Sequence, residues 1–178
     1  MIRTASAVLL AALIGVPVLA AETKYALTGD NTKVEFTGTK KEGKHDGGFK
    51  KLTGTATTDG GALKAIEVEI DTDSLYSDAD GLTKHLKAPD FFNVKENPKA
   101  TFKTTKIETT AKGVTVTGDL TLLGKTKPVT FPATVAEKDG TLTLKGEFKI
   151  DRTNWGMNTG AGKIDNDVAL RVNVTAKK

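Results

Sequence analysis

The sequence predicts an all-β fold built as a closed antiparallel sheet of eight strands. Eight segments alternate apolar with polar residues, which is the period-2 pattern of strands that bury one face. Most of these segments are joined by short turns such as Asp59-Gly60-Gly61, which suit antiparallel neighbours. No segment of any length after residue 20 has the 3.6-residue period of a helix. Even strand spacing and sequential hairpins favour an up-and-down barrel over a sandwich.

The expected strands follow one another with one long interruption in the middle and a second near the end. They are expected at residues 31–39, 48–58, 63–71, 100–109, 114–122, 128–135, 142–150 and 168–174. We interpret residues 25–27 as a short apolar lead-in and residues 40–47 as a polar turn. Glycines within 48–58 predict a bulge or a bend. Pro132 has no N–H group for a strand ladder, so we expect it at an edge or a bulge.

Residues 1–20 have the composition of a secretory signal peptide that is removed on export. Arg3 supplies an early positive charge, an uncharged apolar run follows over 5–19, and small residues precede cleavage after Ala20 or Ala21. The run is shorter than the ~20 residues that a membrane-spanning helix needs, and a proline interrupts it. We therefore expect a cleaved leader and an exported domain over residues 21–178.

The composition of that domain argues against several classes of protein. Without Arg3 its net charge is +3, one less than the +4 of the whole chain, and its lysines form no single patch, which argues against nucleic-acid binding. Two tyrosines and one tryptophan are too few for the aromatic girdles of an outer-membrane barrel, so we expect no stable membrane insertion. The absence of cysteine indicates a fold that needs no disulfide.

The longest interruption of the strand pattern covers residues 72–99 and contains two adjacent phenylalanines. Asp80 can cap a short helix with its carboxylate, and a proline allows a second helical turn before Phe91 and Phe92. We expect two short helical turns that present Leu82, Leu86 and at least one of the phenylalanines to one end of the barrel. These side chains could plug the barrel as ordinary core, or they could form a lid over a ligand cavity. Both alternatives remain open from the residues alone.

Three parts of the chain together resemble the signature of one protein family. They are 85–94 (HLKAPDFFNV) with Asn97-Pro98 and Thr101-Phe102, 118–124 (GDLTLLG) with Lys127-Pro128-Val129, and 150–152 (IDR) with Trp155-Gly156-Met157. In this order and spacing they resemble the YceI-like family over nearly all of residues 21–178. The resemblance implies an eight-stranded antiparallel lipocalin-like barrel with short helical segments in the 72–99 connection. It also implies an apolar tunnel for long amphiphiles, polyisoprenoids above all, in an exported and usually periplasmic protein without known chemistry on them.

Few residues are suited to catalysis or to metal binding. The chain has no cysteine, and its two histidines, His45 and His85, lie 40 residues apart. A general acid–base role for His85 and a weak cation site at Asp78, Asp80 and Asp90 are conceivable, but none of these residues has the spacing of a known motif. We therefore predict a protein that is not an enzyme and has no cofactor and no metal.

The dipeptide Asp151-Arg152 directly follows a predicted strand and permits two interpretations. The two side chains could form a structural ion pair that orients a loop at the barrel mouth. Alternatively, Arg152 could meet the pyrophosphate of a bound lipid.

The resulting hypothesis is a periplasmic carrier that holds a long-chain amphiphile in the apolar interior of the barrel. Candidate ligands are a polyisoprenoid, an isoprenoid quinone or a fatty acid derivative. The residues expected to contact the ligand are Phe36, Val68, Ile70, Leu86, Phe91, Phe92, Phe102, Phe148 and Trp155. Two alternatives are an enzyme acting on an isoprenoid lipid and a secreted stress or interaction module without a ligand. No nucleic-acid partner is expected, and a homodimer is left open.

Overall fold

One antiparallel sheet of eleven strands forms almost the whole of the protein. The computed structural model describes residues 22–178, so the predicted signal peptide lies outside the described residues. The strands are β1 (Glu22–Thr28), β2 (Thr32–Lys40), β3 (Gly43–Phe49), β4 (Leu52–Asp59), β5 (Ala62–Asp71), β6 (Leu75–Ser77), β7 (Lys99–Thr110), β8 (Gly113–Leu122), β9 (Lys125–Lys138), β10 (Thr141–Asp151) and β11 (Ile164–Lys177). One α-helix, α1 (Asp80–Lys87), and two 3₁₀ helices, η1 (Thr72–Ser74) and η2 (Arg152–Trp155), complete the fold.

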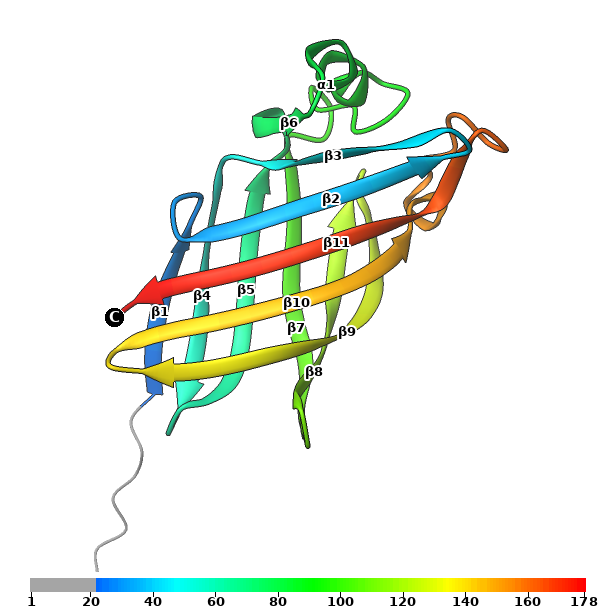
Figure 1. The fold of residues 1–178 in the computed structure, drawn as a ribbon. Helices are drawn as coiled ribbons and strands as arrows, with labels where there is room; N and C mark the ends of the chain where they lie inside the picture. The colour runs from blue at the N-terminus through cyan, green and yellow to red at the C-terminus, as the bar shows by residue number, and fades with distance from the viewer. Residues whose placement is uncertain (1–21) are drawn as a thin grey trace, which may run out of the picture.

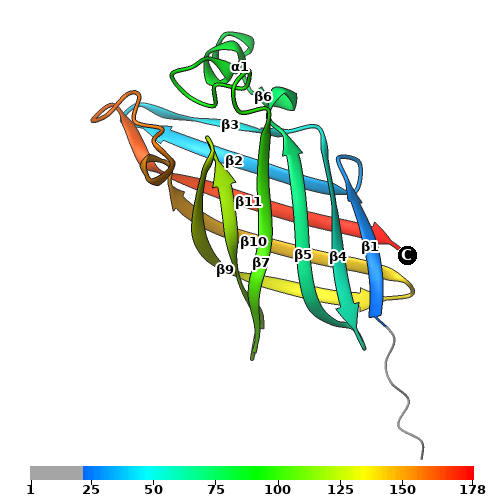
Figure 2. The ribbon, with the colours of Figure 1, turned by 180° about the vertical axis from the view of Figure 1, so that it is seen from behind.

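The sheet curls back on itself so that its two halves enclose the interior. Its strand order is β1-β4-β5-β7-β8-β9-β10-β11-β2-β3-β6. In Figures 1 and 2, strands β1, β4, β5, β7 and β8 form one layer, and strands β10, β11, β2 and β3 cross over it as the other. Strand β9 belongs to both halves, because it pairs with β8 up to Ala133 and with β10 from Ala133 onward. The all-β antiparallel barrel that the sequence predicts is confirmed.

The strand count differs from the prediction, because three strands carry little sequence signal. All eight expected strands are present, but β1, β3 and β6 add to them. Strand β1 has only Tyr25 and Leu27 as buried apolar residues, and β6 has three residues in all. Strand β3 contains three glycines and resembles a turn, yet it pairs with β2 over seven residues. One of these glycines, Gly47, leaves space for the Phe36 ring, since a Cβ there would lie 2.4 Å from Phe36 Cζ.

The expected interruption at Pro132 is confirmed by the strand pairing. The ladder between β9 and β10 ends at the pair Ala133–Gly146, immediately next to Pro132. Beyond this point the first part of β9 follows β8, and the last part of β10 follows β11. The two halves of the curled sheet therefore separate here.

Of the two helical turns expected around residues 80–93, the first is the helix α1 and the second is a series of turns, while η1 and β6 precede them in the 72–99 connection. Asp80 is the first residue of α1 and does not cap it, because the N-cap position is Ala79 and no side chain caps the helix. After α1 the chain makes a series of turns in which Phe92 N–H donates to Leu86 O, at 3.0 Å. Asn93 has a left-handed backbone (φ 43°), which asparagine tolerates, and its carbonyl accepts the N–H groups of Glu96 and Asn97 in the turn that follows. Within residues 22–178, no helix is both long and apolar enough to cross a bilayer.

Candidate ligand-binding cavity

The interior of the curled sheet is densely packed at the end far from α1. We call this region the packed half. Its inward-facing side chains are at most 5% exposed: Tyr25, Leu27, Ala56, Val116, Ala133, Leu142, Leu144, Val174 and Ala176. Such burial is typical of an ordinary core, whose close packing excludes water.

Toward α1, strands β8, β10 and β11 keep their apolar pattern, but their inward-facing side chains are only half-buried. Along β10, Leu142 and Leu144 are buried while Phe148 and Ile150 are half-buried. Strand β8 shows the same gradient from Val116 to Leu120 and Leu122, and β11 shows it from Val174 back to Leu170 and Val168. We call this region the hollow half. It contains a cavity of about 150 Å³.

The wall of this cavity is apolar and comes from both layers of the sheet and both long connections. The sheet contributes Val34, Phe36, Gly38, Phe49, Ile70, Ala100, Leu120, Leu122, Ile150, Ile164, Val168 and Leu170. The first connection adds Leu86, Phe91 and Phe92, and the second adds Arg152 and Met157. Among the described residues of this wall, Arg152 alone is ionisable. The arrangement suits an apolar molecule and has no evident nucleophile or base.

The segment 80–94 covers the cavity through few contacts, and we call it the lid. Helix α1 has no buried side chain within Asp80–Lys87. Its polar attachments go to two residues: Lys87 Nζ contacts Asp73 Oδ1 (3.3 Å) and the Asp73 carbonyl, and Thr83 Oγ1 contacts the N–H (2.9 Å) and the hydroxyl (2.8 Å) of Ser77. Beneath the helix, the Phe92 ring meets Phe49 edge-on at 5.6 Å between ring centroids. Elements with few buried contacts open at low free-energy cost, so α1 is the part of the lid most able to move.

The second long connection is held by the buried side chain of Arg152. Its guanidinium donates to the backbone carbonyls of Asp165 (3.1 Å), Ile164 (3.4 Å) and Met157. No carboxylate of the described residues lies within ion-pair distance of Arg152. Because backbone carbonyls satisfy the guanidinium, its role in this structure is to fix the loop that includes Met157.

The side chain of Asp151 caps η2 instead of pairing with Arg152. Its Oδ1 accepts hydrogen bonds from Thr153 Oγ1 (2.6 Å) and from Thr153 N–H (2.9 Å). These bonds favour the charged carboxylate, so the pKa of Asp151 is lowered by the Thr153 hydroxyl first and by the Thr153 N–H next. The two interactions set the start of η2.

The nine residues expected to contact a ligand fall into two groups. Phe36, Ile70, Leu86, Phe91 and Phe92 border the cavity. Val68, Phe102 and Phe148 lie outside its wall, half-buried and packed against the core. Trp155 is 2% exposed, and its Nε1–H donates to Leu120 O at 3.0 Å.

The cavity also has wall residues that our sequence analysis did not select. The even spacing of Leu120 with Leu122 and of Val168 with Leu170 could have identified these residues as inward-facing. No periodic pattern marks Met157, which reaches the cavity because Arg152 holds its loop.

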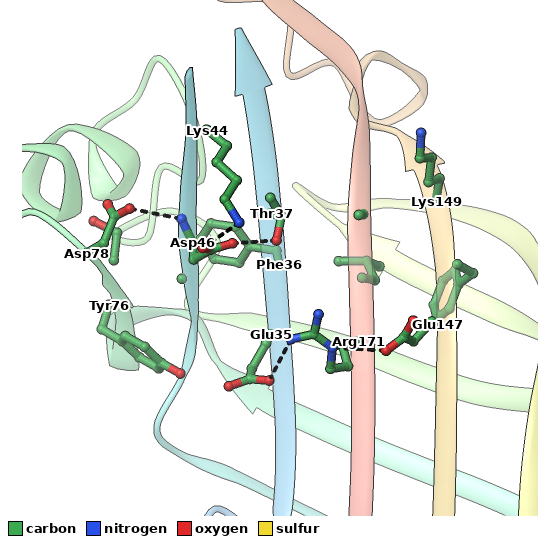
Figure 3. Close-up of a pocket in the computed structure, with 15 residues that line it drawn as sticks. Glu35, Phe36, Thr37, Lys44, Asp46, Tyr76, Asp78, Glu147, Lys149 and Arg171 are labelled. Carbon is green, nitrogen blue, oxygen red and sulfur yellow. Dashed lines mark hydrogen bonds and ion pairs between the residues drawn. The ribbon is translucent and has the colours of Figure 1, made fainter. Parts of the chain in front are cut away.

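A second hollow of about 630 Å³ lies on the outer surface, over β3, β2, β11 and β10 (Figure 3). Most of its charged groups are paired within the described part of the chain, although Lys149 is not. Arg171 contacts Glu147 (3.1 Å) and Glu35 (3.7 Å), and Lys44 contacts Asp46 (3.5 Å). This groove is therefore a solvated polar face, and the smaller apolar cavity is the better candidate for a ligand site.

None of the histidines and aspartates considered from the sequence for catalysis or cation binding is a residue of the cavity wall. Asp78 accepts a hydrogen bond from Asp46 N–H (3.1 Å), and its Oδ1 lies 3.0 Å from His45 Nδ1. The pKa of Asp78 is lowered, by the backbone N–H of Asp46 first and then by His45. His85 packs edge-on against the Phe91 ring at 4.9 Å between ring centroids. Among the described residues, no group of three or more metal-binding side chains gathers at one point.

Comparison with known proteins agrees with this geometry. The model of the YceI-like domain matches residues 25–176, which is most of the chain. The chain belongs to the YceI-like family. This YceI-like chain is 44% identical over 91 residues to a UPF0312 protein of Pseudomonas putida, with 49% of this chain and 47% of that protein aligned. It is 33% identical over 136 residues to the protein YceI of Escherichia coli, covering 72% of this chain and 71% of that protein. The chain thus spans about half the length of the first relative and more of the second.

Two solved structures share the fold of this YceI-like chain. BcnA of Burkholderia cenocepacia superposes with a TM-score of 0.75 at 27% identity, covering 82% of this chain and 96% of that chain. A structure from Saccharophagus degradans superposes with a TM-score of 0.66 at 14% identity, covering 89% and 98%. The latter protein is described as a polyisoprenoid binding domain implicated in plant cell wall breakdown. At 14% identity this second likeness concerns the fold alone.

Proposed function

We propose that the protein binds the apolar chain of an amphiphilic lipid in the cavity of the hollow half. The observation that supports this most is the gradient of burial along β8, β10 and β11, from a packed core to an apolar cavity within the same strands. An apolar cavity lowers the stability of a fold, because its lining loses contacts that a filled core has. A bound apolar chain restores those contacts and removes apolar surface from water.

A polyisoprenoid is the ligand class that we propose first. The likeness in fold to a domain described as polyisoprenoid binding supports this choice. Isoprenoid quinones and fatty acid derivatives present the same kind of apolar chain and remain members of the proposed class. The cavity wall is apolar apart from Arg152, so the polar head group of such a lipid would stay at the mouth of the cavity.

The size of the cavity requires the lid to move when a long chain binds. A cavity of about 150 Å³ is the size of an engineered one that holds benzene, and pockets for larger ligands run from about 300 to 1,000 Å³. A long chain therefore needs space that Leu86, Phe91 and Phe92 occupy in this conformation. Helix α1 buries no side chain completely, so its outward movement breaks few buried contacts of the helix itself.

We further propose that binding involves no chemistry on the lipid and takes place in the periplasm. The apolar cavity wall supports the first point, because its single ionisable side chain is engaged by backbone carbonyls. The leader composition of residues 1–20 supports the second, with the domain over 21–178 released by cleavage. The mixed surface charges fit a carrier without a nucleic-acid partner.

Extraction of the purified protein with organic solvent, followed by mass spectrometry, tests this proposal. We expect a lipid with a long apolar chain in a ratio near one per protein. A matched variant, Gly38→Leu, places a side chain inside the cavity, because a Cβ at Gly38 would meet no heavy atom within 4 Å. It should fold and lose the lipid.

The control Gly81→Leu makes the same exchange in α1, away from the cavity wall, and should keep the lipid. Lipid-free protein whose melting temperature does not change on addition of prenols would contradict the proposed function. Equal lipid retention in the Gly38 and Gly81 variants would place the ligand elsewhere.

A further inference from the structure

Three phenylalanine rings form a cluster inside the sheet, below the cavity. They come from three strands: Phe102 from β7, Phe131 from β9 and Phe148 from β10. The rings of Phe131 and Phe148 are stacked, with 4.3 Å between centroids and 9° between planes. The Phe102 ring is tilted by 50° against Phe131 at 5.8 Å between centroids. We call this cluster the aromatic floor.

The aromatic floor lies at the boundary between the two halves of the interior. Phe148 is paired in register with Leu170, and Phe102 is paired with Leu120; both leucines belong to the cavity wall. The next inward-facing residue with a side chain along β10 is Leu144, which is buried in the packed half. The three rings therefore lie next to the cavity wall, on the side of the core to which Phe131 belongs.

Two glycines on β8 and β10, the strands on either side of β9, leave room for the rings of this floor. At Gly118 on β8, a Cβ would lie 2.5 Å from Cζ of the Phe102 ring. At Gly146 on β10, a Cβ would lie 3.3 Å from two carbons of the Phe131 ring. A side chain at either position would press on the ring beside it. The rings are thus seated against the wall at one level, and a chain that enters from the lid meets their faces and edges.

We propose that the aromatic floor sets the maximum length of lipid chain that the cavity accepts. This inference rests on the proposed function, because it concerns the same cavity. Each isoprene unit that enters adds buried apolar surface and raises the affinity until the end of the chain reaches the rings. Units beyond that limit stay outside the cavity and add little. The floor thus determines specificity for chain length. Substitution of Phe148 tests this most directly, since the stacked ring of Phe148 lies beside the wall residue Leu170.

A series of linear prenols with increasing numbers of isoprene units tests this proposal. Dissociation constants are measured by displacement of a fluorescent fatty acid from the delipidated full domain. For the unmodified protein we expect the affinity to rise with each unit and then to level off. In Phe148→Ala the levelling point should move to longer prenols by at least one isoprene unit. For the first prenol beyond the original limit, the affinity should increase about tenfold.

Two further variants keep the test decisive if Phe148→Ala does not fold. Phe148→Leu retains an apolar side chain at the same position but removes the stacked ring, and it should shift the levelling point in the same direction. Val174→Ala removes volume from the packed half, beyond the floor, and should leave the levelling point unchanged. Folding of each variant is checked by its thermal melting curve.

The outcomes separate the two proposals. A levelling point that stays in place in a folded Phe148 variant would overturn the role of the floor and leave lipid binding intact. A protein that binds no prenol of any length would overturn the proposed function itself. A shift of equal size in Val174→Ala would show that general loosening, rather than the floor, controls the length.

Discussion

The packed half and the hollow half of the interior are made by the same strands, yet they differ in what their apolar residues do. Leu142 and Leu170 lie on adjacent strands and both face inward, but Leu142 is fully buried while Leu170 borders the cavity. A buried side chain contributes mainly to the free energy of unfolding. A side chain that borders a cavity contributes less to folding and remains available to a ligand. The comparison shows that one strand can serve stability at one end and recognition at the other.

The largest expected effect is on stability in the packed half. Leu142→Ala should lower the free energy of unfolding by about 2–5 kcal/mol, because it opens a cavity where the side chain is now 0% exposed. Denaturant titration measures this loss. Folded Leu142→Ala protein should still bind prenol with nearly the original affinity. A loss of lipid binding out of proportion to the unfolded fraction would break the distinction between the two halves.

The next effect concerns the lid. Replacing both Phe91 and Phe92 with Ala should weaken prenol binding at least tenfold. This corresponds to a loss of at least about 1.4 kcal/mol of binding free energy. Both rings border the cavity, and the lid has few other contacts with the body of the protein. The variant is compared with the unmodified protein in thermal melting and in prenol titration. A collapse of stability with little change in the affinity of the folded protein would mean that the segment is a plug.

A smaller effect is expected for Leu170→Ala. Since Leu170 already borders empty space, we expect a loss of unfolding free energy near the low end of the range for buried leucines, about 2 kcal/mol or less. Its prenol affinity should fall, in contrast to that of Leu142→Ala. Parallel measurements on the two variants sharpen the comparison. Equal losses of stability and equal prenol affinities in the two variants would contradict the distinction between the packed half and the hollow half.

The smallest effect is the pH dependence of the stability that Asp151 contributes by capping η2. The lowered pKa of Asp151 means that its bonds to Thr153 add stability above the ordinary carboxyl pKa of about 4, and this contribution is lost as the pH falls through the lowered value. Asp151→Asn should therefore melt at a lower temperature than the unmodified protein near neutral pH. The difference should shrink in acid. A difference that is constant or grows as the pH falls would contradict the capping role.

The fold was predictable because its strongest strands alternate and its turns contain glycine. The alternation of Leu142, Leu144 and Ile150 identifies the strand and its inward face. The alternation does not show which of these residues lie in the packed half and which in the hollow half, since all three are apolar. That difference depends on what lies opposite in space. At Gly118 and Gly146 the wall has no side chain, and the rings of Phe102 and Phe131 fill the space.

The candidate site was predictable in part for a similar reason. Phe36 and Ile70 follow from alternation, and Leu86, Phe91 and Phe92 follow from an apolar segment in a polar connection. Met157 gave no periodic signal, because a buried arginine places it through backbone hydrogen bonds. The capping role of Asp151 was also hidden, since adjacent opposite charges suggest an ion pair and the structure forms none within 4.0 Å.

Methyl NMR spectroscopy of leucine and valine residues during a prenol titration tests the central claim most directly. We expect the methyl signals of Leu120, Leu122, Val168 and Leu170 in the hollow half to shift as prenol is added. Those of Val116, Leu142, Leu144 and Val174 in the packed half should stay nearly unchanged. Shifts spread equally over both halves, or confined to residues of the outer polar groove, would contradict the claim that the hollow half is the lipid site.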